Sequence, residues 1–347
     1  MRLSRVGQLV AGVVALIVSA SCEHKELCFD HPSHALRSDT RIVASYNLRW
    51  EIGESGEPSW QGRWPESFGI GYGALAPSVP AGLCVNAYSE SGPPAVTHMA
   101  ATGGVAGMAV GENSLLLYND DTEYIVFDNM SASASAKATT RSRSRSSYNG
   151  NPMYRPQNGE DERTVTPPDP LFGCYMNRYE QQLLPVPATL DVTLQPLVFT
   201  YLIRYEFEHG IEYVGLARGA LAGMAESVFL HDGHTGPERA TVLYDCTVEP
   251  WGVQATVNTF GVPDYPSPVY RSGAQSSYAL NLEVRLRNGR TFSFDFDIFA
   301  QMKSQPHGGV IIVDGISVSD DDGNVGGSGF DVSIDDWGEY NDVIINL

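Results

Sequence analysis

Four of the five cysteines, Cys28, Cys84, Cys174 and Cys246, are the side chains of this sequence best suited to covalent or metal chemistry. None of them belongs to a C-x-x-C motif, and the closest two are 56 residues apart. A compact zinc site made from them is therefore not expected. If the chain is exported, they could form disulfides, for which three pairings exist, or they could be buried free thiols. The sequence leaves both possibilities open.

Histidines and carboxylates are the next candidates for metal ligands. His31 and His34 lie in a proline-containing polar segment, where such residues are expected without a metal. The stretch "DDDGNVGGSGFD" (320–331) has oxygen side chains at a spacing similar to that of an EF-hand loop. However, Val325 stands where that loop needs glycine, and Asp331 replaces its bidentate glutamate. We therefore predict a solvated turn there, and no metal site or cofactor.

Motifs of known catalytic chemistries are missing from the sequence. It contains no G-x-S-x-G, H-E-x-x-H, S-x-x-K or G-x-x-x-x-G-K-[ST]. "GIGYGA" (69–74) lacks the strand and helix that flank a dinucleotide loop, and we interpret it as a turn. We predict that the protein is not an enzyme and has no small-molecule substrate. Five tryptophans could stack on sugars or could fill a β core: Trp50, Trp60, Trp64, Trp251 and Trp337.

The N-terminal segment has the three parts of a secretory signal. Arg2 and Arg5 precede an apolar run from Leu9 to Val18, and small residues follow at 19–21. The run is shorter than the ~20 residues of a transmembrane helix. The small residues end directly on Cys22, in a pattern that resembles the lipobox of bacterial lipoproteins, although Ser19 replaces the usual leucine.

This resemblance implies cleavage before Cys22 and lipidation of its sulfur, with an ordinary signal peptide and an incidental cysteine as the alternative. Residues 1–21 would then be the signal peptide, and residues 22–35 the lipidated tether. Each buried CH₂ of an acyl chain contributes about 0.8 kcal/mol, so more than one chain would hold the protein at a membrane. We expect a lipid-anchored protein of the outer membrane or cell surface.

The composition limits the partners of this 347-residue chain. Its formal charge is −19, and it becomes −21 when the signal peptide with its two arginines is removed. Such an acidic protein is not expected to bind nucleic acid or anionic lipid. Gly 35, Pro 21 and Tyr 17, together with only 18% charged residues, are typical of an extracytoplasmic β protein with many turns.

Alternation of apolar and polar residues predicts strands along most of the chain. In "SYALNLEVRLRNGRTFSFDFDIF" (277–299), two alternating runs flank Asn288-Gly289, which predicts a hairpin with a type I′ turn. A second hairpin is predicted in "NSLLLYNDDTEYIVFDN" (113–129), with its turn at 119–122. "LQPLVFTYLIRYEFEHG" (194–210) predicts a long strand with one apolar face. The C-terminal "DVIINL" (342–347) is predicted as a strand, either at the edge of its own sheet or donated to a partner.

Helical patterns are scarce, and only 176–184 and 217–229 could each form a turn or two. We predict an all-β protein with few short helices and two β-sandwich domains, at 36–178 and 179–347. Within the first domain, residues from about 130 to 170 are poor in large apolar side chains, which predicts a mobile segment. Its basic run offers a protease-sensitive loop, or an exposed loop that is not processed, at Arg141, Arg143 and Arg145.

Several motifs together resemble one known family. They are "ELCFDHPSH" (26–34), "LLLYNDDTEYIVFDN" (115–129), "PPDPLFGCY" (167–175), "LDVTLQPLVFTYLIRYEFE" (190–208), "GALAGMAESVFLHDG" (219–233), "VNTFGVP" (257–263) and "FDVSIDDWGEYNDVIINL" (330–347). They look like an outer-membrane lipoprotein family of the Bacteroidales, of unassigned function, that is similar to the FimB/Mfa-like fimbrillin-associated proteins. The likeness extends over the whole mature chain.

The resemblance implies two tandem transthyretin-like, or fimbrillin-like, β-sandwiches on a lipid anchor. It further implies a structural or adhesive role as a fimbrial anchor or accessory subunit that binds fimbrillin-like subunits. The edges of such sheets carry unpaired N–H and C=O groups that can accept a strand from a partner. A surface glycan-binding lipoprotein is the alternative.

Overall fold

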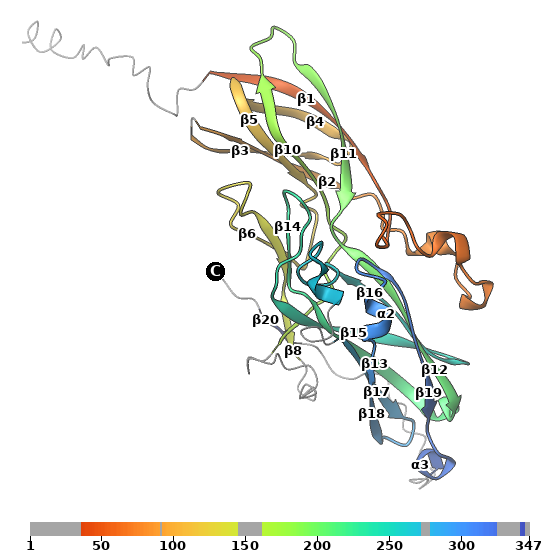
Figure 1. Ribbon diagram of the computed structural model, residues 1–347. Helices are drawn as coiled ribbons and strands as arrows, with labels where there is room; N and C mark the ends of the chain where they lie inside the picture. Colours follow the sequence, from red (N-terminus) through yellow and green to blue (C-terminus); the bar gives the residue numbers. More distant parts are fainter. Residues whose placement is uncertain (1–35, 91, 145–161, 272–277, 325–340, 344–347) are drawn as a thin grey trace, which may run out of the picture. The chain divides into compact units, whose positions relative to one another are not determined.

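The computed structural model describes residues 36–90, 92–144, 162–271, 278–324 and 341–343, and residues 37–347 belong to one compact unit. Nearly all of its regular structure is β, so the prediction of an all-β fold is confirmed (Figure 1). The described helices are short: α2 (Phe299–Met302), α3 (Asp320–Asn324), and the 3₁₀ turns η2 (Gln61–Arg63), η3 (Glu66–Phe68), η4 (Tyr72–Leu75), η6 (Ile211–Tyr213) and η7 (Pro268–Arg271).

Seven strands form a closed barrel. β1 pairs in parallel with β11 and antiparallel with β4, which closes the circle. Alternate residues of each strand point inward, as for Leu83, Val85 and Ala87, and these side chains form an apolar core. In order around the barrel the strands are β1 (Arg37–Tyr46), β11 (Ala188–Pro196), β10 (Phe172–Gln181), β5 (Gly111–Tyr118), β2 (Gly82–Ser89), β3 (Gly92–Ala100) and β4 (Gly103–Ala109).

A second sheet of ten strands folds over itself in the manner of a sandwich. Tyr205 lies on β12, yet its hydroxyl reaches the Tyr244 hydroxyl at 2.7 Å and the Asn281 carbonyl at 3.3 Å, on strands that are not its neighbours. The main path runs β18 (Thr291–Asp297), β17 (Ala279–Leu286), β13 (Val214–Ala225), β15 (Arg239–Glu249), β16 (Gly252–Thr259), β12 (Phe199–His209) and β19 (Gly309–Ser317), and β9 (Arg163–Val165), β8 (Ser142–Ser144) and β20 (Asn341–Val343) lie off it.

A three-stranded sheet contains β14 (Ser227–Phe229), β7 (Lys137–Thr140) and β6 (Ile125–Asp128). The predicted hairpin of residues 113–129 is therefore wrong, because β5 belongs to the barrel and β6 pairs with β7. Side-chain hydrogen bonds hold the connection that leads from β5 in the barrel to β6 in the three-stranded sheet. Asn119 accepts from the Phe172 N–H at 2.7 Å, and Asp169 accepts from the Glu123 N–H at 2.8 Å.

The predicted hairpin of residues 277–299 is confirmed as β17 and β18, but its turn type is wrong. Gly289 has φ +88°, whereas Asn288 is not among the residues with positive φ, as a type I′ turn would require. The Leu286 N–H donates to the Arg290 carbonyl, and the Gly289 N–H donates to the Leu286 carbonyl. These bonds define a three-residue loop, in which a type I turn is followed by a glycine bulge.

Both segments predicted as short helices are strands. Residues 176–184 lie largely in β10, and residues 217–229 lie in β13 and β14. The small residues of β13 suit a sheet because Tyr244 packs directly on Gly219, where any Cβ would collide with its ring. Neighbouring strands thus override the weak helical tendency of an Ala/Gly run.

The segment predicted as mobile contains short strands. Within 130–170 the structure describes β7, β8 and β9, and the alanines at 136 and 138 are fully buried. Here, buried small side chains and backbone pairing between strands order the chain, although large apolar residues are few. The predicted domain border after residue 178 lies inside β10, and the division into two sandwich domains remains a prediction.

Candidate functional site

Those predicted site residues that the structure describes do not converge on one place. Cys22, Cys28, Arg145, His31, His34 and Asp331 lie outside the described residues. Cys84 and Cys174 carry free thiols, and Cys246 is half-buried beside the core of the second sheet. Among the described residues, no helix has the length and apolar character that a membrane span requires.

Cys84 and Cys174 flank β5 but face opposite sides of the barrel wall. Cys84 is opposite Tyr118 and packs outside the barrel, whereas Cys174 is opposite Leu117 and packs against the barrel core. Burial raises the pKa of both thiols, which keeps them protonated and weakly reactive.

The described arginines of the basic run belong to paired backbone. The Arg141 N–H donates to the Tyr124 carbonyl at 3.0 Å, and Arg143 lies in β8 with its guanidinium 6.0 Å from the Tyr124 ring centroid. A protease needs extended, unpaired backbone, so the structure offers less access at these two residues than the sequence suggested.

Tryptophans and their neighbours form an aromatic cluster, defined here as Trp50, Trp60, Trp64, Phe68 and Tyr72. It packs on Leu202 of β12 and Val310 of β19, which buries the second face of these strands. Two of its three indole N–H groups are used internally, since Trp60 donates to Gln305 at 2.7 Å and Trp64 donates to the Ile70 carbonyl at 2.8 Å. The structure thus uses these tryptophans for packing.

Glu51 holds the segment that carries the aromatic cluster. Its buried carboxylate accepts from the Ser59 N–H at 3.1 Å, the Ser59 hydroxyl at 2.7 Å, the Trp60 N–H at 2.6 Å and the Tyr72 hydroxyl at 3.2 Å. Burial and this contact raise the pKa of Tyr72. Nearby, the Arg204 guanidinium lies 3.7 Å from the Trp251 ring centroid and 4.8 Å from that of Phe68.

One edge of the second sheet, that of β19, is capped by two glutamines. Gln305 accepts from the Val310 N–H at 2.7 Å and donates to the Val310 carbonyl at 3.0 Å. Gln301 accepts from the Ile312 N–H at 3.0 Å and donates to the Ile312 carbonyl at 2.7 Å. These side-chain amides take the place of a further strand, and they protect this edge against pairing with other chains.

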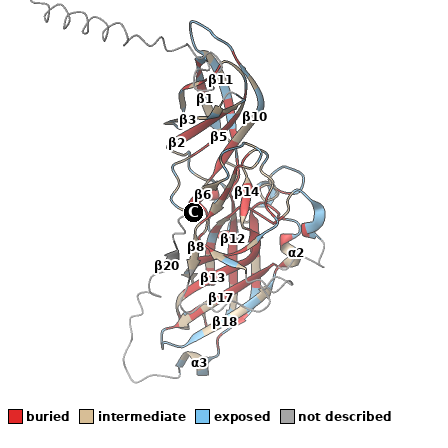
Figure 2. Cartoon of the chain, turned by 90° about the vertical axis from the view of Figure 1, so that its left-hand side faces the viewer, coloured by how far each residue is buried: buried red, intermediate tan, exposed pale blue. Residues whose placement is uncertain are grey.

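The opposite edge, β18, has no such cap among the described residues. The Leu286 N–H donates to the Arg290 carbonyl, and the Ile298 N–H donates to the Tyr278 carbonyl. Because backbone groups alternate in direction along an antiparallel strand, the even-numbered residues of β18 direct their N–H and C=O groups toward β17, and the odd-numbered residues direct theirs away from it. The backbone N–H and C=O groups of Ser293 therefore point away from the sheet. Figure 2 shows β18 partly exposed along its length, while β13 and β17 are mostly buried.

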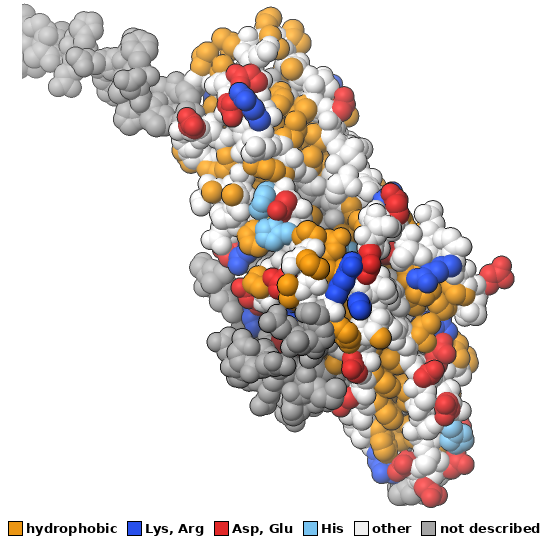
Figure 3. Space-filling view, in the orientation of Figure 1, with side chains coloured by type: hydrophobic (Ala, Val, Ile, Leu, Met, Phe, Trp, Pro, Cys, Tyr) orange, Lys and Arg blue, Asp and Glu red, His pale blue; other side chains and the backbone are white. Residues whose placement is uncertain are grey.

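The side chains of β18 alternate along this open edge. Phe292, Phe294 and Phe296 are half-buried against the core of the sheet, and Thr291, Ser293 and Asp297 are exposed. Apolar side chains reach the surface in this region, and acidic side chains are dispersed over the face drawn in Figure 3. The edge thus offers backbone hydrogen bonds together with one apolar face to an added strand.

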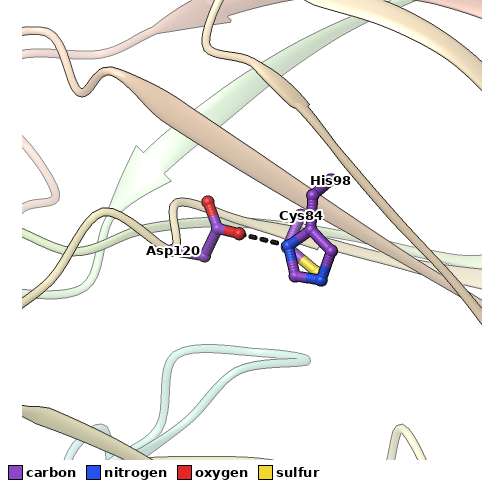
Figure 4. Close-up of side chains that lie close together, drawn as sticks. All are labelled: Cys84, His98 and Asp120. Carbon is purple, nitrogen blue, oxygen red and sulfur yellow. Dashed lines mark hydrogen bonds and ion pairs between the residues drawn. The ribbon is translucent and has the colours of Figure 1, made fainter.

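Two groups of side chains have the composition of a metal site, and the sequence analysis predicted neither. The first is Cys84, His98 and Asp120, in which the His98 Nδ1 contacts the Asp120 carboxylate (Figure 4). Cys84 and His98 are direct cross-strand partners on β2 and β3, a relation that the sequence does not reveal. The second is His231, Asp232 and His234, whose signal was the local "HDGH" pattern.

The fold defines an all-β protein built from a closed barrel, a ten-stranded sheet and a small three-stranded sheet. The chain belongs to the family described as a domain of unknown function (DUF5119), whose model matches residues 72–245. The family resemblance drawn from the sequence motifs is confirmed. A search of curated proteins gives no match.

Solved structures from Bacteroidales resemble the chain. A Bacteroides ovatus protein proposed to be an adhesin has a TM-score of 0.56 at 16% identity, covering 83% of this chain and 94% of that one. The fimbrial anchor protein Mfa2 from Porphyromonas gingivalis has a TM-score of 0.39 at 10% identity, covering 80% and 91%. A Bacteroides thetaiotaomicron protein proposed to bind polysaccharides has a TM-score of 0.42 at 7% identity, covering 79% and 90%. The first of these shows that the two share a fold.

Proposed function

We propose that this protein is a structural or adhesive subunit of the cell envelope, a fimbrial anchor or accessory protein, that binds a partner subunit at the β18 edge. The observation that carries the proposal is the difference between the two edges of the second sheet. Gln301 and Gln305 cap β19, whereas Ser293 of β18 turns its backbone N–H and C=O away from β17, and no cap covers it among the described residues. A sheet with one capped edge and an uncapped position on the other is suited to controlled strand addition.

The partner strand has a definite chemistry. Antiparallel pairing would place apolar side chains beside Phe292, Phe294 and Phe296, where they would cover the half-buried rings. On the other face, hydroxyl or basic side chains would lie beside Ser293 and Asp297. We expect an extended segment of a fimbrillin-like subunit with this alternation.

Replacing Ser293 by proline should block the added strand. Proline lacks the outward N–H of this position but spares the ladder to β17, because Ser293 is not one of the residues that bond to β17. We expect binding of fimbrillin-like subunits, measured by surface plasmon resonance, to weaken by about 10-fold or more, since one hydrogen bond is lost and the ring obstructs the approaching strand.

Ser293→Ala is the matched control. Both variants lose the 2.8 Å bond from Asn281 to the Ser293 hydroxyl, and only the proline variant loses the N–H. Binding that is equal in the two variants, or unchanged in both, would contradict docking at this edge.

The membrane attachment is proposed to depend on Cys22. Its support is the apolar segment and small residues that precede it, and the formal charge of −19, which does not favour electrostatic binding to anionic lipid. Replacing Cys22 by alanine should move the protein from the membrane fraction to the soluble fraction of fractionated cells, and should detach or shorten the fimbriae. Cys28→Ala is the control, because it removes a nearby thiol and leaves the anchor. A Cys22→Ala strain with unchanged fractionation and fimbriae would refute the anchor.

A glycan-binding role finds less support in the structure. Of the tryptophans that the structure describes, Trp50 is buried, Trp60, Trp64 and Trp251 are half-buried, and the Trp251 ring is occupied by Arg204. Trp337 lies outside the described residues. A sugar would need an exposed aromatic face on which to stack.

A further inference from the structure

The residues that follow β14 form a loop with a fixed conformation. The Gly233 N–H donates to the Phe229 carbonyl at 2.9 Å, and the Phe229 N–H donates to the His234 carbonyl at 2.9 Å. Gly233 has φ +74°, a region that glycine enters without cost. The Asp232 carboxylate accepts from the His234 N–H at 3.1 Å, which closes the turn from within.

This loop brings two imidazoles and a carboxylate together. Asp232 Oδ2 lies 3.2 Å from His231 Nε2, and Asp232 Oδ1 lies 2.6 Å from His234 Nδ1. The potential ligand atoms of the three side chains all lie within 4.8 Å of one another. Zinc binds such nitrogen and oxygen ligands at about 2.0–2.2 Å, so tetrahedral ligand atoms stand about 3.3–3.5 Å apart, and small side-chain adjustments would suffice.

Neighbouring rings hold the two imidazoles in place. Phe229 stacks on His234 with centroids 4.1 Å apart, and Tyr175 meets the His231 ring edge to face at 5.9 Å. His231 Nδ1 is buried and has no hydrogen-bond partner among the described residues. A buried nitrogen without a hydrogen bond lowers stability, so a bond at Nδ1 is not what sets the orientation of the His231 ring. What the orientation achieves is to direct Nε2 toward Asp232.

The charge of the loop also suits a cation. Burial acts to raise the pKa of Asp232, but the His234 hydrogen bonds and the two imidazoles outweigh it and hold the pKa below its ordinary value. The three side chains remain accessible, with exposures of 22% for His231, 48% for Asp232 and 37% for His234.

The group of Cys84, His98 and Asp120 is less suited to a metal. Its thiol is fully buried, and it donates to the Asn86 side-chain oxygen at 3.4 Å. Burial raises the pKa of Cys84, whereas a metal ligand must be a thiolate. His98 and Asp120 contact each other beside this buried thiol (Figure 4).

We propose that His231, Asp232 and His234 form a zinc site with its fourth coordination position open to solvent. Three protein ligands and an accessible face leave room for a water molecule or for a side chain of another protein. The site lies on the loop after β14 and does not involve the β18 edge, so it is independent of the proposed strand docking.

Titration of the purified full-length protein with Zn²⁺, followed by calorimetry, tests the site. We expect one zinc ion per chain. His231→Ala and His234→Ala should each weaken binding by more than about 100-fold, since even loss of an outer-shell partner costs about 10–100-fold. Asp232→Asn keeps an oxygen for the turn and removes the charge, so it should weaken binding without unfolding the loop.

His98→Ala serves as the control and should leave zinc affinity unchanged. Titration with Co²⁺ separates the two groups by spectroscopy, because a Cys84 thiolate ligand would give a sulfur-to-cobalt charge-transfer band and the HDGH loop would not. Loss of binding only in the 231, 232 and 234 variants, with no such band, supports the site. The zinc site would be refuted if binding survived the changes at 231, 232 and 234, or if no binding were detected. It would also be refuted if binding depended on His98 or showed the thiolate band.

Discussion

Replacing Trp50 by alanine should lower the free energy of unfolding by about 3–5 kcal/mol, the range typical of a large aromatic side chain removed from a core. Trp50 is 1% exposed and lies at the centre of the aromatic cluster. Its ring centroid is 5.7 Å from that of Trp64 and 5.0 Å from that of Tyr72. The cavity would therefore loosen the cluster that covers β12 and β19 together.

Urea denaturation followed by circular dichroism measures this effect without relying on tryptophan emission. Trp50→Phe is an informative companion, because it keeps an aromatic ring and removes an indole N–H that has no partner among the described residues. It should cost less than the alanine variant. Val186→Ala is the surface control, since Val186 is 71% exposed and its truncation should change stability by no more than about 0.5 kcal/mol. A loss at Trp50 no larger than at Val186 would show that the cluster does not stabilise the sheet.

Acid should destabilise the protein through His307. This imidazole is buried, with ring centroids 4.2 Å from Phe199 and 4.1 Å from Tyr265, and its Nε2 has no hydrogen-bond partner among the described residues. Burial lowers the pKa of His307 from 6.5 to about 3. The folded protein therefore keeps the ring neutral at pH values where the unfolded chain takes up a proton.

The direction of the effect follows from this difference in proton binding. Above about pH 6.5 both states are neutral at this residue, and stability is unaffected. Below it, stability falls by about 1.4 kcal/mol per pH unit until about pH 3, which amounts to about 3 kcal/mol at pH 4. His307→Phe should keep the stacking and remove this contribution.

The measurement is urea denaturation of both proteins between about pH 8 and about pH 4. Other groups that titrate in this range affect both proteins, so the informative quantity is the difference between their free energies of unfolding at each pH. We expect this difference to shift in favour of His307→Phe as the pH falls. A difference that is constant across the range would contradict a buried neutral imidazole.

Local sequence pattern predicted those elements whose alternation matches a strand with a single apolar face. The β17–β18 hairpin is the clearest case, because Leu280, Leu282 and Val284 alternate with polar residues before an Asn-Gly turn. The turn type was missed because Asn-Gly fits both a type I′ turn and a type I turn followed by a glycine bulge. The hydrogen bond from the Leu286 N–H to the Arg290 carbonyl selects the second, and the dipeptide alone does not predict that bond.

Features that depend on distant contacts were not predictable in the same way. β12 was expected to have one apolar face, but Leu202 and Arg204 on its other face are buried by the aromatic cluster, whose residues lie about 130–150 positions earlier in the chain. The glutamine caps on β19 depend on α2 lying beside that edge, and glutamine has no sequence signal for such a role. The HDGH pattern was visible in the sequence, but only the turn shows that its ligand atoms converge.

The order of residues was enough to predict the β class and the family resemblance, both of which are confirmed, because each depends on composition or on neighbours a few positions apart. The lipobox-like pattern at Cys22 has the same local origin and stays a prediction. Strand pairing across the barrel, the difference between the β18 and β19 edges, and the burial of His307 were decided by the folded chain alone. The physical reason is that period-two alternation specifies which side of a strand is apolar, but not which strand lies beside it. That choice is made by the contacts of the whole core, and those contacts join residues that lie far apart in the sequence.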